Sequence, residues 1–145
     1  MNQDEYIKTR VDDQLKWYGK KSSINKTYYY CLKALIIILS VIITLMAGIK
    51  ELDDNIANNY IFITSLLGAL IAILTALSSL WKFQDKWISY RLTSENLKKE
   101  KFLFLTTSKP YDEQNAFSLF VNRIETLLAT EKQEWSAVVN DDVEA

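Results

Sequence analysis

The stretch that decides the fold runs from Tyr60 to Leu80 and reads YIFITSLLGALIAILTALSSL. It contains no charged residue, and as an α-helix it would be roughly 30 Å long. That length matches the hydrocarbon core of a bilayer. The sequence therefore predicts a membrane-spanning helix over residues 60–80.

A second apolar block, Ala34 to Ile49, precedes it. This block reaches spanning length when the helix begins near Tyr30 and Lys33 extends back toward the headgroups. We expect a first spanning helix at 31–49, joined by an extracytoplasmic loop at 50–59 into an antiparallel hairpin. The alternative is a pair of core helices in a soluble protein. It is disfavoured because so short a chain has too little else to cover two helices that are apolar almost all round.

The lysines predict the orientation of this hairpin. Cations precede the first block and follow the second, whereas residues 50–59 contain only Lys50. By the positive-inside rule, both termini face the cytoplasm. The same inner boundary is marked by aromatic residues on both sides, namely Tyr28, Tyr29, Tyr30, Trp81, Phe83 and Trp87.

The flanking segments predict a cytoplasmic helical bundle, so that the chain as a whole is an all-α membrane protein. We expect an N-terminal helix at 1–30, an unbroken extension of the second span at 81–107, an amphipathic helix at 112–136 capped by Asp112, and a disordered acidic tail at 137–145. Apolar stripes along these helices comprise Ile7, Val11, Leu15 and Tyr18, and Phe117, Phe120, Val121, Ile124, Leu127, Leu128 and Trp135, while Arg123, Glu125 and Lys132 project elsewhere. Arg91 with Glu95, and Glu95 with Lys99, are i,i+4 pairs.

The second span has one face of small and weakly polar residues. They are Thr64, Ser65, Gly68, Ala72, Thr75, Ala76 and Ser79. Such a face permits close packing of helices in lipid, and in a ring of copies it can line a narrow aqueous path. The first span has a weaker version, in which Ser40 and Thr44 are expected to bond back to carbonyls of their own helix.

Three acidic residues of the outer loop, Glu51, Asp53 and Asp54, offer a further pair of interpretations. Around an axis shared by several copies they would form an anionic rim that concentrates cations. In a single chain they would be a solvated loop. The sequence leaves both interpretations open.

Composition argues against several other functions. The chain has no histidine and one cysteine, Cys31, which leaves neither the commonest general base nor a Cys/His zinc site. We see no catalytic constellation, no cofactor motif and no metal-ligand spacing, and therefore expect no enzyme. The net charge is −1, and no basic stripe indicates a nucleic-acid partner.

The polar segments resemble those of the SLATT superfamily, a group of bacterial two-transmembrane effector domains widely labelled a domain of unknown function. The residues that carry the resemblance are Asp13-Gln14-x-x-Trp17-Tyr18-x-Lys20, Asn25-Lys26, Tyr90-Arg91-x-x-x-Glu95-x-Leu97-Lys98-x-Glu100, Tyr111, Phe120-x-x-Arg123-Ile124-Glu125 and Glu131-x-x-x-Trp135. The resemblance implies assembly of copies in the bacterial inner membrane into a pore, with cytoplasmic nucleotide-signalling proteins as partners and a defence role. It also implies that the recurring residues Trp17, Tyr18, Arg91, Glu95, Glu100 and Trp135 fasten the cytoplasmic bundle.

The sequence therefore favours a homo-oligomeric, cation-preferring ion channel or pore in the lipid bilayer. The alternative is a non-conducting membrane scaffold or sensor that docks a cytoplasmic partner. This alternative predicts an exposed apolar face on the last helix, including Phe117, Phe120 and Ile124.

Overall fold

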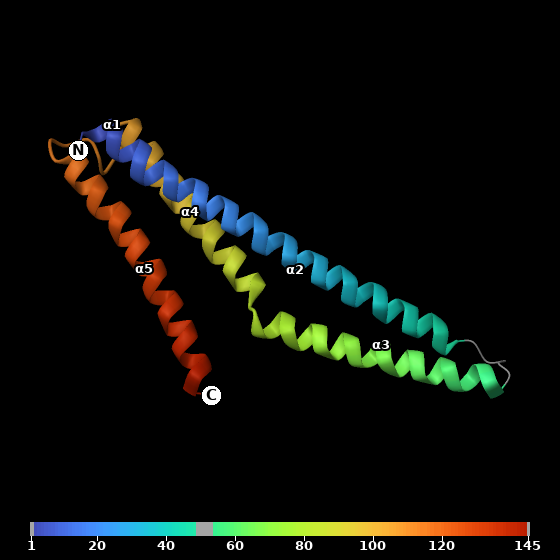
Figure 1. The fold of residues 1–145 in the computed structure, drawn as a ribbon. Helices are drawn as coiled ribbons and strands as arrows, with labels where there is room; N and C mark the ends of the chain where they lie inside the picture. Colours follow the sequence, from blue (N-terminus) through green and yellow to red (C-terminus); the bar gives the residue numbers. More distant parts are fainter. Residues whose placement is uncertain (1, 49–53, 145) are drawn as a thin grey trace. The chain divides into compact units, whose positions relative to one another are not determined.

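The computed structural model describes residues 2–48 and 54–144, and their side chains at 2–48, 59–131 and 133. These residues are all-α, as predicted. In chain order the helical segments are α1 (Gln3–Tyr6), η1 (Ile7–Val11), α2 (Asp12–Ala47), α3 (Asp54–Leu80), α4 (Phe83–Leu105) and α5 (Ala116–Glu144) (Figure 1). The chain divides into two compact units. Unit 1 comprises Met1–Ser23 and Lys86–Ala145, and unit 2 comprises Ile24–Asp85.

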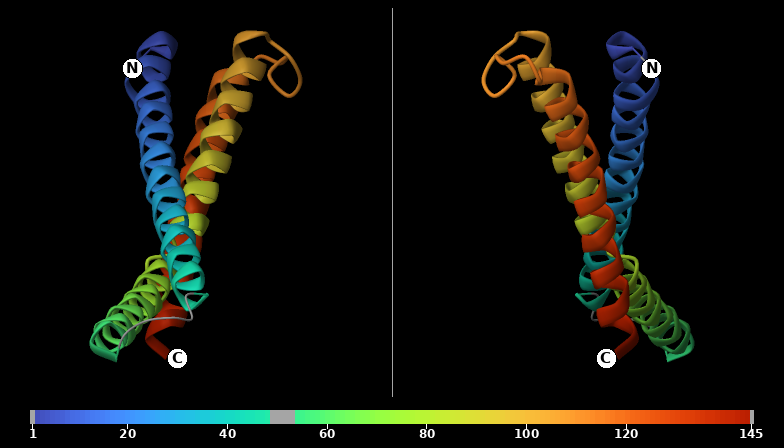
Figure 2. Two further views of the ribbon diagram at one scale, coloured as in Figure 1. Left: turned by 90° about the vertical axis from the view of Figure 1, so that its right-hand side faces the viewer. Right: turned by 90° about the vertical axis from the view of Figure 1, so that its left-hand side faces the viewer.

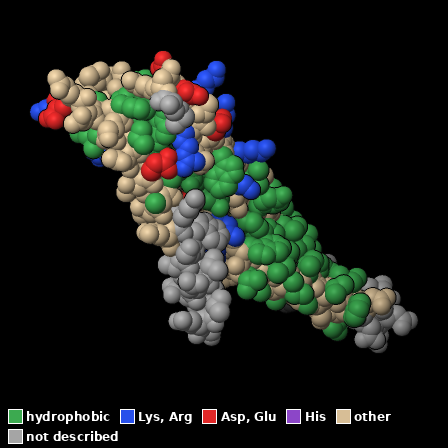
Figure 3. Space-filling model, turned by 60° about the vertical axis from the view of Figure 1, so that its left-hand side comes forward, with side chains coloured by type: hydrophobic (Ala, Val, Ile, Leu, Met, Phe, Trp, Pro, Cys, Tyr) green, Lys and Arg blue, Asp and Glu red, His purple; other side chains and the backbone are tan. Residues whose placement is uncertain are grey.

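Unit 2 is a hairpin in which the later part of α2 packs antiparallel to α3 (Figure 1). Within the described residues, the segments Gln3–Ala47 and Asn59–Leu105 each contain a window long and apolar enough to cross a membrane, with mean hydropathies of 2.4 and 2.3. No residue of either window is buried. Hydrophobic side chains accordingly cover the visible face of the hairpin, whereas charged side chains gather on unit 1 (Figure 3).

Bulky apolar residues at three- and four-residue spacing form the contact between the two hairpin helices. They are among the half-buried positions of each helix, namely Leu32, Ile36, Leu39, Ile43 and Met46 of α2 and Leu67, Ile71, Leu74 and Leu77 of α3, with Thr64 half-buried on the same helix. This spacing presents one continuous stripe of each helix to the other. The hairpin is therefore held mainly by large side chains.

The second apolar helix does not continue unbroken into α4, contrary to the prediction. It ends at Leu80, and Lys82 adopts a left-handed backbone conformation with φ of 45°. The Lys82 N–H then donates to the Ser79 carbonyl at 3.3 Å, the short reach typical of a helix C-terminus. Directly afterwards the Phe83 ring stacks on Tyr28 of α2, with 5.7 Å between ring centroids. The break therefore places Phe83 against α2.

Unit 1 is a helical bundle with its own apolar core. It combines the N-terminal helical segments, α4 and α5, and the last two meet at the loop that joins them, at the top of both views in Figure 2. The core residues are Tyr6, Ile7, Val11, Tyr18, Leu97, Phe104, Tyr111, Phe120, Ile124 and Leu128. Both predicted apolar stripes contribute to it, with Leu15, Phe117, Val121 and Leu127 packed at its edge.

A π-helical turn at η1 shapes the start of the bundle. A π-turn takes one residue more than an α-turn, so it rotates the preceding residues relative to α2. Tyr6, directly before this turn, and Ile7, at its start, are both buried, although adjacent residues of an α-helix point in different directions. Tyr6 was not part of the predicted stripe.

The last helix differs from its predicted bounds at both ends. It begins at Ala116, and its first intrahelical bond, from the Leu119 N–H, ends on the Asn115 carbonyl. Asn115 rather than Asp112 thus occupies the N-cap position. The intervening residues reverse the chain after the bond from Ser108 N–H to the Leu103 carbonyl that closes α4. At the other end α5 reaches Glu144, through the segment expected to be disordered.

Candidate functional sites in the hairpin and the bundle

The small face of α3 lies on the surface of unit 2. Of its seven predicted residues, Thr64 is half-buried, and Ser65, Gly68, Ala72, Thr75, Ala76 and Ser79 are exposed. Beyond the adjacent part of its own helix, a Cβ added at Gly68 would meet no atom within 4 Å. The hairpin therefore does not use this glycine for a close helix contact, and the small face is available to something outside the protomer.

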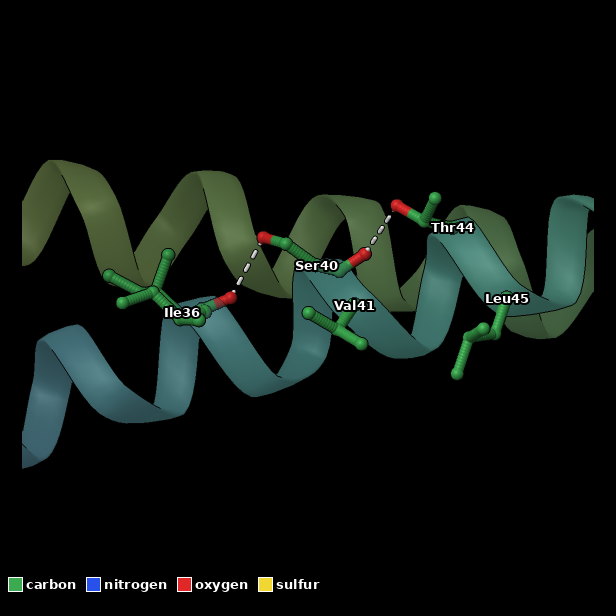
Figure 4. A pocket seen from close by; sticks show the side chains of 6 residues that line it. Ile36, Ser40, Val41, Thr44 and Leu45 are labelled. Atoms are coloured by element: carbon green, nitrogen blue, oxygen red, sulfur yellow. Dashed lines mark hydrogen bonds between the residues drawn. The ribbon is translucent and has the colours of Figure 1, made fainter.

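The hydroxyl groups of both spans that carry a recorded bond return it to their own helix. Thr64 Oγ1 donates to the Tyr60 carbonyl at 2.9 Å, and Ser65 Oγ donates to the Ile61 carbonyl at 2.8 Å. In α2, Ser40 bonds to the Ile36 carbonyl at 2.8 Å and Thr44 to the Ser40 carbonyl at 2.9 Å (Figure 4). This confirms the prediction for Ser40 and Thr44, and it lowers the polarity of both surfaces.

Ser40 and Thr44 also line a shallow groove along α2, whose lining includes exposed and half-buried residues (Figure 4). The other lining residues are aliphatic, namely Ile36, Ile37, Val41 and Leu45. Because the two hydroxyls bond within the helix, the groove offers a mainly apolar surface. A lipid chain or another apolar helix fits such a surface, whereas a polar ligand does not.

The predicted acidic rim falls outside the described part of the chain. Glu51 and Asp53 are not described, and Asp54 begins α3 with a side chain that is not described. The rim therefore stays a prediction.

In unit 1, a carboxylate of α5 ties that helix to the N-terminal segment. Arg10 donates to both oxygens of Glu125, from Nε at 2.9 Å and from Nη2 at 2.8 Å. The Tyr6 hydroxyl donates to Glu125 Oε1 at 3.0 Å. The paired geometry fixes the orientation of both side chains, since a guanidinium and a carboxylate are planar.

A second carboxylate repeats this arrangement between α4 and α5. The buried side chain of Glu100 accepts a hydrogen bond from the Tyr111 hydroxyl, and its Oε2 lies 3.3 Å from Nε of Arg123. The Tyr111 ring is fully buried and packs edge-on against Phe104 and Phe120. Glu100 thus anchors both the connection after α4 and the first part of α5.

A third pair joins α2 to α5. The Tyr18 hydroxyl donates to Glu131 Oε2 at 2.9 Å, and both residues are buried. Tyr18 also meets the rings of Trp17 and Tyr90, at centroid distances of 4.9 and 6.0 Å. This ring cluster connects α2 to α4. An ion pair between Lys101 of α4 and Asp12 of α2 joins the same two helices.

The environment of the three tyrosines keeps them protonated. Burial, followed by the hydrogen bond to a glutamate, raises the pKa of Tyr6, Tyr18 and Tyr111 well above the ordinary value of 10.0. A neutral hydroxyl donates to the carboxylate, whereas a tyrosinate beside it would be repelled. The tyrosines therefore act as structural donors.

The residues predicted to fasten the bundle divide into several groups. Tyr18 and Glu100 lie inside it, and Trp17 packs on Tyr18 while 45% exposed. Arg91 and Glu95 form their i,i+4 pair at 2.9 Å on the surface of α4. Glu95 also pairs with Lys98, at 3.2 Å, although the sequence predicted Lys99. Trp135 is in α5, with a side chain that is not described.

Sequence reasoning missed the functional geometry of Arg10, Arg123 and Glu125. Arg123 and Glu125 project off the apolar stripe of α5, as predicted. Their side chains, however, form ion pairs with other helical segments, Arg123 with Glu100 of α4 and Glu125 with Arg10. The repeated association of tyrosine, arginine and glutamate in the resembling segments was the available signal. Among the described residues, no group of three or more acidic or thiol side chains is placed to hold a metal ion.

Comparison with known proteins adds a family. Residues 13–118 match DUF4231, whose description is a protein of unknown function. The match begins at the second residue of α2, covers both apolar helices and α4, and ends in the first turn of α5. No curated protein and no solved structure matches the chain. Since the match covers most of its length, the chain belongs to the DUF4231 family.

Proposed function

We propose that the protein assembles with copies of itself in the lipid bilayer to form an ion channel or pore. The observation that carries this proposal is the small face of α3, which the hairpin leaves uncovered. The half-buried residues of α3 are mostly large, so the exposed part of the small face has no packing role within the hairpin. A neighbouring copy gives it one.

Membrane insertion is supported by the exposure of the two apolar windows. A core helix of a soluble protein has a similar composition but is covered by the rest of its chain. Here no residue of either window is buried, and exposure of so much apolar surface to water would be very unfavourable. Hydrocarbon is the environment that suits these windows.

Assembly is supported by what two helices can do in that environment. Helices in lipid associate through close packing of small residues, because no hydrophobic drive exists between them. Two helices alone cannot enclose an aqueous path, whereas a ring of hairpins can. The exposed Thr75 and Ser79 would give such a path weakly polar walls.

Placement in a bacterial inner membrane, with both termini cytoplasmic, follows from the lysine distribution and the resemblance to SLATT domains. That resemblance also suggests how the pore is used, as a defence effector opened by a nucleotide-signalling partner. The outer acidic residues would favour cations. Each of these points is part of the proposal.

Reconstitution into planar bilayers tests conduction. We expect discrete current steps that grow in number with the amount of purified protein added. The control for detergent artefacts is a variant in which the residues of the small face are replaced by leucine and which is purified in the same detergent. Silence of the native chain across voltages, pH values and common ions would count against a channel.

The alternative, a scaffold that docks a cytoplasmic partner, is weakened on α5 but keeps a candidate docking surface on α4. Phe120 and Ile124 are buried in the bundle, so α5 does not offer the expected apolar face. Instead α4 exposes Leu92, Phe102 and Leu105, at 61%, 65% and 54%. A photo-crosslinking residue at Phe102, compared with one at exposed Glu113, tests this surface in cells. Specific adducts with a different protein, rather than with a second copy, would support the scaffold.

A further inference from the structure

Two lysines of α2 converge on one pair of tyrosine rings at the N-terminal end of the hairpin. Lys26 Nζ lies 6.0 Å from the centroid of the Tyr30 ring, four residues further along. Lys33 Nζ lies 5.8 Å from the centroid of the Tyr29 ring, four residues back. The two ammonium groups thus approach the same helical turn from opposite directions. We call these four residues the lysine–tyrosine clamp.

The spacing places the clamp on one face of α2. Lys26 and Lys33 are seven residues apart, close to two full helical turns, so their side chains leave the same side of the helix. Tyr29 and Tyr30 lie between them, with their rings edge-on at 5.3 Å. Lys26, Lys33 and Tyr30 are exposed, and Tyr30 is 54% exposed. The clamp therefore faces outward from the hairpin.

The clamp sits where the proposed membrane position would put the inner headgroups. The stack of Tyr28 on Phe83 brings together the residues that precede the first apolar block and follow the second. Aromatic rings of this kind gather at the membrane–water interface. Lys33 begins about 7.5 Å deeper than Tyr28, and its ammonium group returns toward the interface. It snorkels, as a lysine near a bilayer boundary does.

The local charge is positive. Among the side chains described in unit 2, Asp85 is the one acidic group, whereas Lys26, Lys33 and Lys82 are cationic. Two ammonium groups near two tyrosine rings suit a phosphate diester, which offers oxygen acceptors and one negative charge. The rings are amphipathic, so they also suit the boundary between that phosphate and its acyl chains.

We propose that the lysine–tyrosine clamp binds the headgroup of an anionic phospholipid from the cytoplasmic leaflet. The inference rests on the membrane insertion in the proposed function, but not on conduction. Anionic lipid would hold the inner end of α2 at a fixed depth. Juxtamembrane lysines gain from the negative surface of that leaflet, which corresponds to roughly a five-fold preference for each lysine.

Native mass spectrometry of the detergent-solubilised full chain tests the clamp. The protein is titrated with dioleoyl phosphatidylglycerol and, separately, with dioleoyl phosphatidylcholine, and the ratio of bound adducts is measured. We expect the native chain to prefer phosphatidylglycerol and the variant Lys26→Gln with Lys33→Gln to lose roughly 5- to 25-fold of this preference. Arginine at both positions should retain it.

The matched control removes the same charge from exposed lysines of unit 1, as Lys99→Gln with Lys109→Gln. This control should keep the preference of the native chain. An equal loss in both double variants would reduce the effect to overall charge and overturn the clamp. So would an unchanged preference in Lys26→Gln with Lys33→Gln. Because lipid adducts are measured rather than current, a silent but lipid-selective protein would refute the channel alone.

Discussion

The guanidinium of Arg10 donates two hydrogen bonds to the carboxylate of Glu125, although the two residues are 115 positions apart in the chain. The Tyr6 hydroxyl donates a third, at 3.0 Å. These bonds join the beginning of the chain to its last helix, while both apolar spans lie between them in sequence. Unit 1 is therefore assembled from segments on both sides of the hairpin in sequence, and its polar contacts join them.

Replacing Glu125 should destabilise unit 1. In Glu125→Ala the buried Tyr6 hydroxyl loses its acceptor and Arg10 loses its partner, which we expect to lower the free energy of unfolding by about 2 kcal/mol. Thermal unfolding of the full chain in detergent, followed by tryptophan fluorescence, measures the change. The control Glu113→Ala removes an exposed carboxylate and should unfold within about 0.5 kcal/mol of the native chain. Equal stability of both variants would contradict the role of Glu125.

Alkaline pH should destabilise the same unit through its buried tyrosines. Burial and hydrogen bonds to glutamates raise the pKa of Tyr6, Tyr18 and Tyr111 in the folded state. Their contribution to stability is therefore complete below the unfolded pKa of about 10 and declines as pH rises above it. Unfolding curves recorded on both sides of that pH measure the loss. The variant with phenylalanine at all three positions should lose less stability over this interval, and an equal loss would contradict the prediction.

Periodicity was sufficient to predict that the chain is helical and where most of its buried faces lie. Val11 and Tyr18 in the first stripe and Phe120 and Ile124 in the last are buried together, because helical spacing alone puts them on one side. The apolar windows were equally visible, since length and the absence of charge need no tertiary information. These parts of the fold depend on residues near each other in sequence.

The break at Lys82 and the glutamate contacts could not be predicted in this way. A left-handed residue is usually signalled by glycine or asparagine, whereas Lys82 and Thr107 carry no such signal. Glu125 and Glu131 find their tyrosines more than a hundred residues away, at Tyr6 and Tyr18. Only the packing of α5 against the N-terminal segment selects those partners.

Two phenylalanines of α4 provide a test of the bundle within one helix. Phe104 is 7% exposed and stacks on Phe120 at 4.3 Å between centroids, whereas Phe102 is 65% exposed. We expect Phe104→Ala to lower the free energy of unfolding by about 3–5 kcal/mol and Phe102→Ala by less than about 0.5 kcal/mol. Thermal unfolding in detergent compares them. A large effect at Phe102 would show that a copy or a partner covers α4.

Neutralising the outer loop should change ion preference if the loop lines a pore entrance. In the variant Glu51→Gln, Asp53→Asn, Asp54→Asn we expect a reversal potential shifted toward that of a non-selective pore, because fewer cations gather at the entrance. Bilayer recordings under a salt gradient measure this shift. The control Asp112→Asn, Glu113→Gln removes exposed acids of unit 1 and should leave the potential unchanged. The same potential in all three proteins would exclude the rim.

A bulky residue on the small face of α3 should prevent assembly without unfolding the protomer. Gly68 is exposed, and beyond the adjacent part of its own helix a Cβ there meets no atom within 4 Å, so Gly68→Leu has room within the hairpin. Between copies, however, the added side chain would hold two helix backbones apart where small residues allow close approach. We therefore expect native mass spectrometry in detergent to show a shift from oligomer to monomer, with helical content unchanged by circular dichroism. Ala69→Leu adds comparable bulk at the neighbouring exposed position, about 100° round the helix, and should leave the oligomer intact. Oligomers that survive Gly68→Leu would place the contact between copies on another face, with the groove along α2 as the next surface to substitute.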